Sequence, residues 1–350
     1  MLLSLIRLWL GPLPKQEIFP DTKPNPLNHW FFHPIKRRVA KYYLWLLQNL
    51  FGLKVIAITG SVGKTTTKDM LASILASQGP TVATTANITP TYNIPTTILR
   101  CSPLTKYLIL EMGIEYIGDM TFYTWLAHPD IAIITPINLT HTLFLNDLET
   151  VTSEKYKIAK NAKHVITYKD VKPETIKLSD TLIGSHFQIN AALAFSAAKI
   201  LNVPHPNLDN FVPPEHRMNL IKLPSGGYLI DDTYNANPLA TTEALKALIE
   251  TSKRLKKTPV FVFGQMNELG QYEKSAHEEI GLKIKSLNIK HLYCLGPATK
   301  HTIKSAGFGE YFETQEELYQ AVYKILDTKY LILIKASRGW HFEDLVEKLV

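Results

Sequence analysis

The stretch KVIAITGSVGKTTT, residues 54–67, decides the fold of this chain, because an apolar run breaks there into a glycine turn. The apolar run predicts a buried β-strand, and the residues from Lys64 onward predict the start of a helix. Gly60 and Gly63 carry no Cβ, so the backbone between strand and helix can curl with its N–H groups turned inward. A helix also directs its positive end at such a turn, and the stretch therefore predicts a phosphate-binding loop.

The loop indicates a nucleotide, ATP or GTP, as its ligand. We expect Lys64 to reach the outer phosphates and the hydroxyl of Thr65 to ligate the accompanying Mg²⁺. The general phosphate-loop pattern has a glycine where Ile58 stands, so the chain matches the shorter form Gly-x-x-Gly-Lys-Thr-Thr. A glycine turn without a ligand is the alternative, and the lysine and threonines that follow argue against it. The other residues expected to contact the phosphates are Gly60, Ser61, Val62, Gly63 and Thr66.

The composition limits the class of protein. The chain has 350 residues, of which 45% are hydrophobic, enough for about two domains with their own cores. Its formal charge of +7 is spread without an uninterrupted basic tract, which favours small anionic ligands over nucleic acid. Cys101 and Cys294 lie far apart and have no metal-ligand spacing, so we expect a reducing compartment, the cytoplasm. We also expect a monomer.

Apolar strand-like runs alternate with helical stretches along the chain, which predicts an α/β fold with mostly parallel sheets. We expect a phosphate-loop ATPase domain over residues 54–211 and a Rossmann-like α/β domain over residues 212–350. The boundary falls near Phe211, in a proline-rich stretch that follows a helix predicted over residues 188–201. Two sheets also imply a cleft between the domains. The predicted strands are residues 55–59, 107–110, 131–134, 164–167, 228–231, 260–263, 291–295 and 330–335.

Residues 1–53 form an N-terminal extension. Residues 1–10 are apolar but shorter than the ~20 residues that a membrane-spanning helix needs. Apolar residues recur at helical spacing over residues 35–50, which predicts a helix that Pro34 opens and Gly52 closes. Basic residues crowd its first turns, so the helix either packs on the ATPase domain, which we favour, or lies peripherally on the anionic inner face of a membrane.

Polar residues at strand ends are candidates for the chemistry, because parallel sheets place their sites there. Glu111 follows the strand 107–110 and is a candidate magnesium ligand. His141 lies in the loop after the strand 131–134; a metal role competes with a structural one, since magnesium prefers oxygen. Lys155, judged by its sequence neighbours alone, indicates a solvated helix face.

Two further motifs lie in the second half of the chain. The run DDTYNANP, residues 231–238, puts two carboxylates at a strand end, where they either hold ribose hydroxyls or cap a helix. The run KASRG, residues 335–339, groups a lysine, a hydroxyl and an arginine after the last strand. Such a group is suited to gripping a carboxylate or phosphate, and a solvated basic turn is the weaker alternative.

From about Lys54 to the C-terminus these motifs resemble those of the Mur ligases, most of all the type that adds D-alanyl-D-alanine (the MurF type). The Tyr-Asn-Ala-Asn-Pro run discriminates best among the subfamilies. The motifs that carry the resemblance are residues 59–67, 111–113, 184–186, 190–192, 231–238, 266–270 and 335–339.

The resemblance implies an ATP-dependent, ADP-forming amide ligase that adds D-Ala-D-Ala to a UDP-MurNAc-tripeptide-like acceptor through an acyl phosphate, in peptidoglycan precursor synthesis. It further implies that Thr65 and Glu111 hold one Mg²⁺, that His141 helps to hold a second, and that Lys155 is carbamylated and becomes a metal ligand. Asn190 would then contact adenine, Arg217 the phosphates and Asp232 the ribose. The residues implied to bind the substrates are Asn87, Asn235, Asn237, Lys335, Ser337 and Arg338.

The chain also departs from the family pattern. The N-terminal domain of the family binds the uridine nucleotide sugar, and residues 1–53 of this chain are too few to form that domain. Phe187, Gln265 and Ala336 replace an expected asparagine, aspartate and glycine. A lipid-linked muropeptide or a polyglutamate therefore remains an alternative acceptor. A nucleotide-binding protein without catalysis is the rival of another class, and the retained candidate catalytic residues argue against it.

Overall fold

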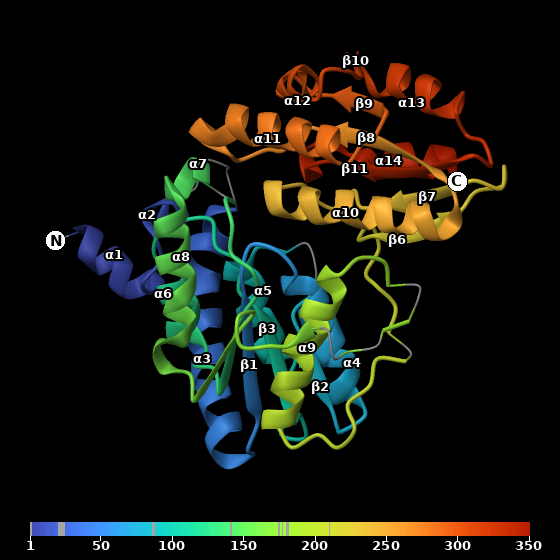
Figure 1. Ribbon diagram of the computed structural model, residues 1–350. Coiled ribbons are helices and arrows are strands. Elements are labelled where there is room, and N and C mark those ends of the chain that lie inside the picture. The colour runs from blue at the N-terminus through green and yellow to red at the C-terminus, as the bar shows by residue number, and fades with distance from the viewer. Residues whose placement is uncertain are drawn as a thin grey trace. The chain divides into compact units, whose positions relative to one another are not determined.

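The computed structural model describes residues 2–19, 25–85, 88–140, 142–173, 176, 178–179, 182–209 and 211–350 (Figure 1). The chain divides into two compact units. The first comprises Met1–Ile137, Phe144–Ile176 and Ile189–Phe211, and the second comprises Asn138–Leu143, Lys177–Gln188 and Val212–Val350. Each unit contains one sheet flanked by helices, so the predicted α/β fold is confirmed.

A five-stranded parallel sheet, in the order β2-β3-β1-β4-β5, forms the centre of the first unit. Its strands are β1 (Lys54–Thr59), β2 (Thr81–Ala83), β3 (Tyr107–Glu111), β4 (Ile131–Ile134) and β5 (His164–Thr167). The helical segments up to residue 200 are α1 (Leu2–Leu10), α2 (Lys15–Ile18), the π-helical turn η1 (Asn28–Phe32), α3 (His33–Leu50), α4 (Lys64–Ala76), α5 (Pro90–Leu99), α6 (Asp119–Leu126), α7 (Thr142–Leu145), α8 (Leu148–Tyr156), the 3-10 helix η2 (Lys157–Asn161) and α9 (His186–Ile200).

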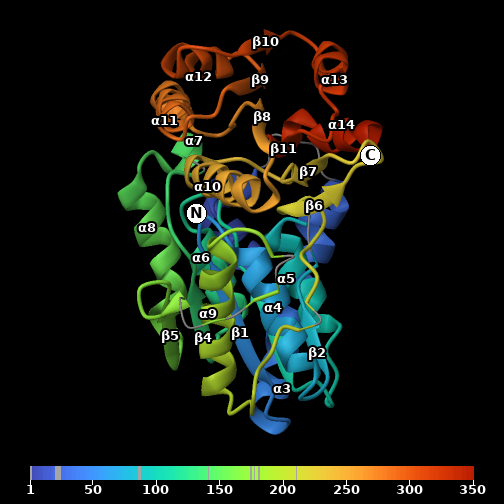
Figure 2. The same ribbon diagram turned by 45° about the vertical axis from the view of Figure 1, so that its right-hand side comes forward.

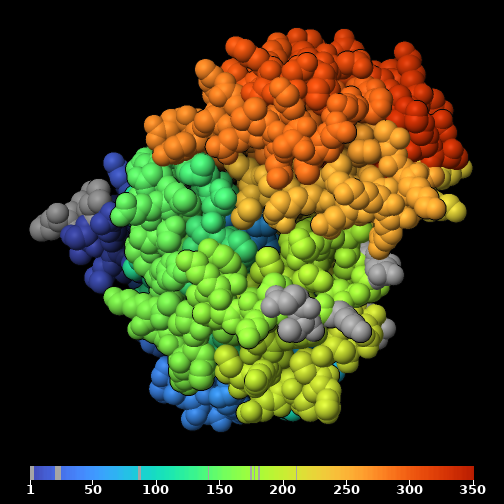
Figure 3. Space-filling model, in the orientation of Figure 1, coloured from blue at the N-terminus to red at the C-terminus, as the bar shows by residue number. Residues whose placement is uncertain are grey.

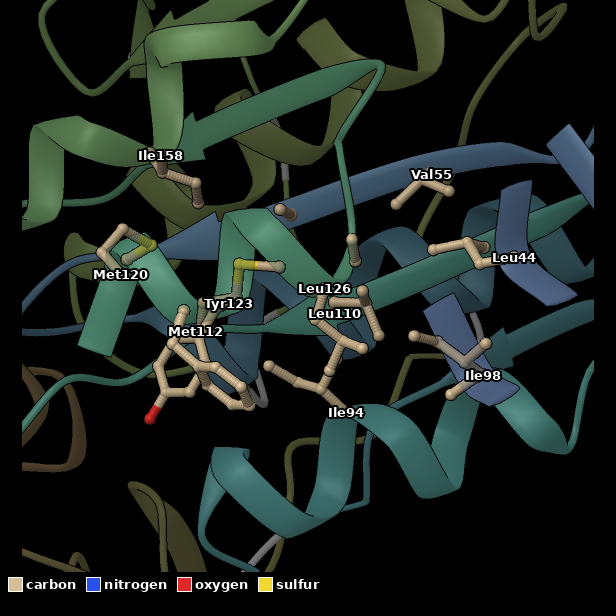
Figure 4. Close-up of a cluster of buried hydrophobic side chains, with 14 of the residues drawn as sticks. Leu44, Val55, Ile94, Ile98, Leu110, Met112, Met120, Tyr123, Leu126 and Ile158 are labelled. Carbon is tan, nitrogen blue, oxygen red and sulfur yellow. The ribbon is translucent and has the colours of Figure 1, made fainter. Parts of the chain in front are cut away.

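One buried apolar cluster of this unit lies on the face of the sheet that α3, α5 and α6 cover (Figure 4). Central parallel strands are buried on both faces, which is why β1 and β4 are nearly uninterrupted apolar runs. The helix α4 packs against β1, β2 and β3. The core side chains labelled in Figure 4 are Leu44, Val55, Ile94, Ile98, Leu110, Met112, Met120, Tyr123, Leu126 and Ile158.

The helix predicted to open at Pro34 begins earlier, and this detail of the prediction was wrong. The backbone is already helical in η1, and α3 itself begins at His33. Proline lacks a backbone N–H, but residues in the first turn of an α-helix donate no intrahelical hydrogen bond. Pro34 is therefore tolerated in the first turn of α3, directly after the π-helical turn η1. Gly52, at φ +72°, follows the helix end as predicted.

The second unit is built on a six-stranded sheet in the order β10-β9-β8-β11-β7-β6, in which only the β6–β7 pair is antiparallel. Helices α13 and α14 cover one face and α10, α11 and α12 the other (Figure 2). Its strands are β6 (Asn219–Lys222), β7 (Tyr228–Asp231), β8 (Thr258–Gly264), β9 (His291–Leu295), β10 (Glu310–Phe312) and β11 (Tyr330–Lys335). Its helices are α10 (Pro238–Leu255), α11 (Glu273–Ser286), α12 (Thr299–Ala306), α13 (Gln315–Tyr323) and α14 (Phe342–Leu349), with 3-10 turns η4 (Gly270–Tyr272) and η5 (Arg338–Trp340).

Candidate active site

The turn between β1 and α4 has the geometry of an anion cradle. Gly60 and Gly63 adopt φ values of +145° and +87°, which favour glycine. A Cβ at Gly60 would lie 1.9 Å from the Thr135 hydroxyl, and one at Gly63 would lie 2.3 Å from Asn190 Oδ1. The N–H groups of Ser61 and Val62 both donate to the Pro136 carbonyl, at 2.9 and 3.3 Å. Neither Gly60 nor Gly63 can therefore carry a side chain, and the first N–H groups of α4 point out of the helix toward the loop.

Lys64 folds back over this loop. Its Nζ donates to the carbonyl of Gly60 at 3.0 Å and to that of Ser61 at 3.4 Å. Thr65, the next residue, donates its hydroxyl to Glu111 Oε1 at 3.0 Å. Glu111 ends β3 and pairs in register with Ile58 of β1, so the sheet itself brings the carboxylate to the loop. Thr66 is buried in the first turn of α4.

These residues fit a magnesium ion bound together with a nucleotide. Hydroxyl and carboxylate oxygens are the ligands that Mg²⁺ prefers, and substrate phosphates and water usually complete its shell. The buried Thr135 hydroxyl beside Gly60 has no hydrogen-bond partner among the described residues. Within the same residues, no three His, Cys, Asp or Glu side chains are grouped so that they could hold a metal by themselves. Thr65 and Glu111 therefore stay predicted ligands.

Lys155 lies in α8 and is buried, with 1% of its surface exposed. Its Nζ donates to the Gly60 carbonyl at 3.0 Å, the same oxygen that Lys64 contacts. Burial lowers the pKa of the Lys155 ammonium well below its usual value, and the charge of Lys64 lowers it further. The reading of Lys155 as a solvated face is wrong, because α8 folds it onto a loop 95 residues away in sequence.

Asn190 also lies next to the loop. It lies in the first half of α9 and is 3% exposed, and its Oδ1 stands where a Gly63 Cβ would collide. The first unit therefore brings together four predicted groups from four segments: the loop, Glu111, Lys155 and Asn190. None of these four lies within 20 residues of another in the sequence.

The second unit gathers the other predicted site residues at the ends of β7 and β11. Lys335, 1% exposed, donates to Asp232 Oδ2 and, at 2.8 Å, to the carbonyl of Asn235. Burial raises the pKa of the Asp232 carboxyl, and the Lys335 ammonium opposes that shift. Ser337 Oγ donates to the Ala236 carbonyl at 3.1 Å. The two motifs 231–238 and 335–339 thus form one polar cluster.

Tyr234, which the sequence analysis did not single out, contacts two cations of this cluster. The guanidinium of Arg217 stands 3.7 Å from the centre of its ring, and that of Arg338 stands 5.4 Å from it. Arginine both stacks on aromatic rings and recognises carboxylate and phosphate groups. The motif Tyr-Asn-Ala-Asn-Pro was the available signal, since its tyrosine follows two carboxylates at a strand end.

Two family models match the chain: the Mur ligase middle domain over residues 58–178 and the Mur ligase, glutamate ligase domain over residues 216–338. The UDP-N-acetylmuramoyl-tripeptide--D-alanyl-D-alanine ligase of Buchnera aphidicola is 30% identical, over 85% of this chain and 75% of that protein. The chain belongs to the Mur ligase family. The Bacillus subtilis enzyme of the same name is 28% identical to this Mur ligase, over 90% of this chain and 79% of that protein.

Solved structures of the family share the fold of this Mur ligase. MurF from Acinetobacter baumannii superposes with a TM-score of 0.82 at 25% identity, over 91% of this chain and 80% of that one. MurF from Thermotoga maritima, solved in complex with ADP, gives 0.79 at 22% identity, over 91% and 83% of the two chains. The predicted family and ligase class are thereby confirmed. None of the helices in the described ranges combines the length and apolar character needed to cross a bilayer.

Two predicted site residues of this Mur ligase, Asn87 and His141, lie outside the described residues. Asn235 is described, and its Oδ1 accepts the N–H of Ala236 at 2.9 Å. The side chain of Asn237 accepts the N–H of Ala240 at 2.9 Å and so caps α10, just before Pro238. The capping interpretation of this motif is thus realised at Asn237, while the ligand roles of both asparagines stay predictions.

Replacing Asn237 by alanine should lower the free energy of unfolding by about 1 kcal/mol, because α10 loses its N-cap. Asn237→Ser, which keeps a capping oxygen, should retain most of that stability. Chemical denaturation of both variants beside the wild type measures the difference. Equal stability of Asn237→Ala and wild type would contradict the capping role.

Proposed function

We propose that this chain is an ATP-dependent, ADP-forming ligase that joins D-alanyl-D-alanine to a UDP-N-acetylmuramoyl-tripeptide in peptidoglycan precursor synthesis. The relatives from Buchnera aphidicola and Bacillus subtilis bear the name of that activity. The observation that carries the proposal is the phosphate loop on which Lys64 and the buried Lys155 converge, with Glu111 beside Thr65. We place the reaction in the cytoplasm.

The first unit would activate the acceptor. A carboxylate is a poor acyl donor until one of its oxygens becomes a good leaving group, so it attacks the γ-phosphorus of ATP and releases ADP. The Lys64 ammonium and the N–H groups at the start of α4 stabilise the negative charge of the transferred phosphoryl group. Mg²⁺, held by Thr65 and Glu111, would supply further charge neutralisation when bound. Asn190, beside the loop, is the expected adenine contact.

Lys155 would be carbamylated in the active enzyme. Only a neutral amine adds CO₂, and burial shifts the pKa of Lys155 downward, in the direction that favours that form. The amine nitrogen bonds to the carbon of CO₂ and loses one proton, which gives an anionic carbamate with two oxygens. The residue thereby changes from a hydrogen-bond donor to a carboxylate-like metal ligand, as the family resemblance implies.

The second unit would bind the remaining groups. Asp232 is the expected ribose contact and Arg217 the phosphate contact. Lys335, Ser337 and Arg338 would face the carboxylate end of the dipeptide, to which their donors are suited. The amine of the dipeptide then attacks the carbonyl carbon of the acyl phosphate, and inorganic phosphate leaves the tetrahedral intermediate. The residues proposed to complete substrate binding are Asn87, Asn235 and Asn237.

A product assay tests this function. The purified chain is incubated with ATP, Mg²⁺, bicarbonate, a panel of acceptors and a panel of amines, and phosphate release and product mass are followed. We expect ADP, phosphate and a pentapeptide product with the UDP-linked tripeptide and D-Ala-D-Ala. If product formed with a polyglutamate acceptor instead, the chain would be assigned a different ligase activity. Absence of ADP release with every pair would favour a non-catalytic nucleotide-binding protein.

A lipid-linked muropeptide is the second candidate acceptor. The observation that favours it is the unusual number of exposed apolar side chains on the N-terminal helices. An enzyme held peripherally at the inner face of the membrane would meet such an acceptor there. The acceptor panel therefore includes the undecaprenyl-linked form in detergent, and a clear preference for it over the UDP-linked form would replace the primary proposal.

A further inference from the structure

About half of the exposed large apolar side chains of the described chain lie on its N-terminal helices, which are a small part of its length. Of the 27 large hydrophobic side chains that are exposed among the described residues, 14 lie between residues 5 and 51. Contiguous exposed apolar surface of this kind marks a protein or membrane interaction site. The 14 side chains are Leu5, Leu8, Trp9, Phe19, Leu27, Phe31, Phe32, Ile35, Val39, Tyr42, Trp45, Leu46, Leu50 and Phe51.

The helix α3 is apolar on two opposite faces. One face enters the core of the first unit through Ala40, Leu44 and Leu47. The opposite face carries a continuous exposed stripe, because residues three or four apart lie above one another on a helix. A helix that only packed on the ATPase domain would be polar on its outer side. The exposed stripe comprises Ile35, Val39, Tyr42, Leu46 and Leu50.

Cations flank this stripe, and acids are absent from it. Residues 22–68 contain no aspartate or glutamate, and residues 1–53 carry seven Lys or Arg against two Asp or Glu. At 100° per residue, Lys36 falls on one flank of the stripe and Arg38 on the other, and Lys41 lies farther round the helix, toward the buried face. Lys41 lies 4.1 Å from the centre of the Trp125 ring. The face therefore combines apolar side chains with positive charge.

The helix α1 contacts α3 and carries three further exposed apolar side chains, Leu5, Leu8 and Trp9. Arg38 donates to the carbonyls of Leu8 and Trp9, at the C-terminal end of α1, and the Trp9 indole N–H donates to the Trp30 carbonyl at 2.8 Å. These bonds fix α1 beside α3, at the margin of the first unit (Figure 3). Beside α1 lies a cavity of about 850 Å³, and the basic side chains among its lining residues are Arg7, Lys15 and Arg38.

We propose that this α1–α3 face, defined as the exposed side chains of α1 and α3, lies on the surface of an anionic lipid bilayer. Amphipathic helices with aromatic and aliphatic side chains on one face and Lys or Arg at its border bind in the plane of such a surface. Trp9, Tyr42 and Trp45 are the residue types that settle at the headgroup level. The cavity beside α1 would then receive a lipid phosphate. This goes beyond the ligase reaction and does not depend on it.

An anionic bilayer fits better than a protein partner for two reasons. The exposed stripe on α3 is narrow and long, and basic side chains border it, so it offers little of the broad apolar patch that a protein interface buries at its centre. The lack of acids over residues 22–68 matches a surface of uniform negative charge. A second copy of this chain would bring the same positive charge and be repelled.

Vesicle co-sedimentation of the full chain tests the proposal. Vesicles of phosphatidylcholine and phosphatidylglycerol in equal amounts are compared with vesicles of phosphatidylcholine alone. We expect binding to the anionic vesicles that weakens as salt is added, because the charge contribution is screened. Tyr42→Gln/Trp45→Gln should weaken that binding by about tenfold or more, since glutamine preserves the helix but removes two interfacial rings.

Matched controls separate this effect from general changes of surface. Leu104→Gln/Leu282→Gln replaces two exposed leucines outside the α1–α3 face and should bind vesicles as the wild type does. Nucleotide binding by each variant reports that it is folded. Wild-type protein that ignores anionic vesicles, or a Tyr42→Gln/Trp45→Gln variant that binds them fully, overturns the proposal. The proposal is also overturned if light scattering shows a wild-type dimer that Tyr42→Gln/Trp45→Gln disrupts, and the wild type does not bind vesicles.

Discussion

Lys155→Ala is expected to lower turnover by about 10³-fold while leaving the affinity for nucleotide within about twofold. The amine is buried against the loop at Gly60, and burial lowers its pKa, which favours the neutral amine that the proposed carbamylation requires. Alanine removes the nitrogen to which the carbamate would attach, but leaves Lys64 and the loop N–H groups in place. Steady-state turnover and calorimetry with a magnesium nucleotide measure the two quantities.

Lys160→Ala is the matched control, because Lys160 is an exposed lysine five residues further along the same segment. It should have wild-type turnover. Two further readouts address the carbamate itself: removal of CO₂ and bicarbonate should lower wild-type turnover reversibly, and acetate should partly restore Lys155→Ala by filling the space with a carboxylate. Full activity of Lys155→Ala would refute the assigned role.

Gly63→Ala is expected to weaken nucleotide binding by about 100-fold or more. The new Cβ would stand 2.3 Å from Asn190 Oδ1, at a residue that already has φ +87°. Asn190 must then move away from the loop, and the loop must change its backbone path, because the left-handed region costs an alanine about 1–2 kcal/mol. Both changes act on groups that face the nucleotide. Calorimetry with ATP or ADP and Mg²⁺ measures the affinity.

Gly52→Ala provides the comparison, since Gly52 has φ +72° and open space where the Cβ would stand. It imposes a similar backbone cost without a collision, so its nucleotide affinity should equal that of the wild type. Thermal unfolding of both variants checks that the folds are retained. If Gly63→Ala bound nucleotide as tightly as Gly52→Ala, the loop would not be the nucleotide site.

The fold could be predicted from the sequence wherever local pattern was strong. The buried strands β1, β3 and β4 are apolar runs that predict strands clearly. The glycine turn after β1, followed by Lys64 and threonines, predicts a phosphate-binding loop. The short edge strands were missed, because three or four half-exposed residues carry little periodic signal. Those strands are β2, β6 and β10.

The site was harder to predict, since its parts meet only in three dimensions. Glu111 could be anticipated because strand ends of a parallel sheet share one edge. Lys155 could not be recognised from its neighbours: the polar residues around it predict a solvated helix, and its burial depends on how α8 packs against the loop. The place of Tyr234 in the site could not be predicted, because it depends on contacts with Arg217 and Arg338, which come from other segments. For Lys155, only the family resemblance supplied a role.

Two amines, those of Lys64 and Lys155, share one acceptor, the carbonyl oxygen of Gly60. The charge of Lys64 adds to burial in lowering the pKa of Lys155, so anything that cancels the positive charge of Lys64 makes protonation of Lys155 easier. A polyanionic triphosphate does this when it draws Lys64 away from the loop. We therefore expect Lys155 to react with CO₂ fastest in the enzyme without nucleotide. The order in which CO₂ and nucleotide are added should then affect how quickly the enzyme becomes active.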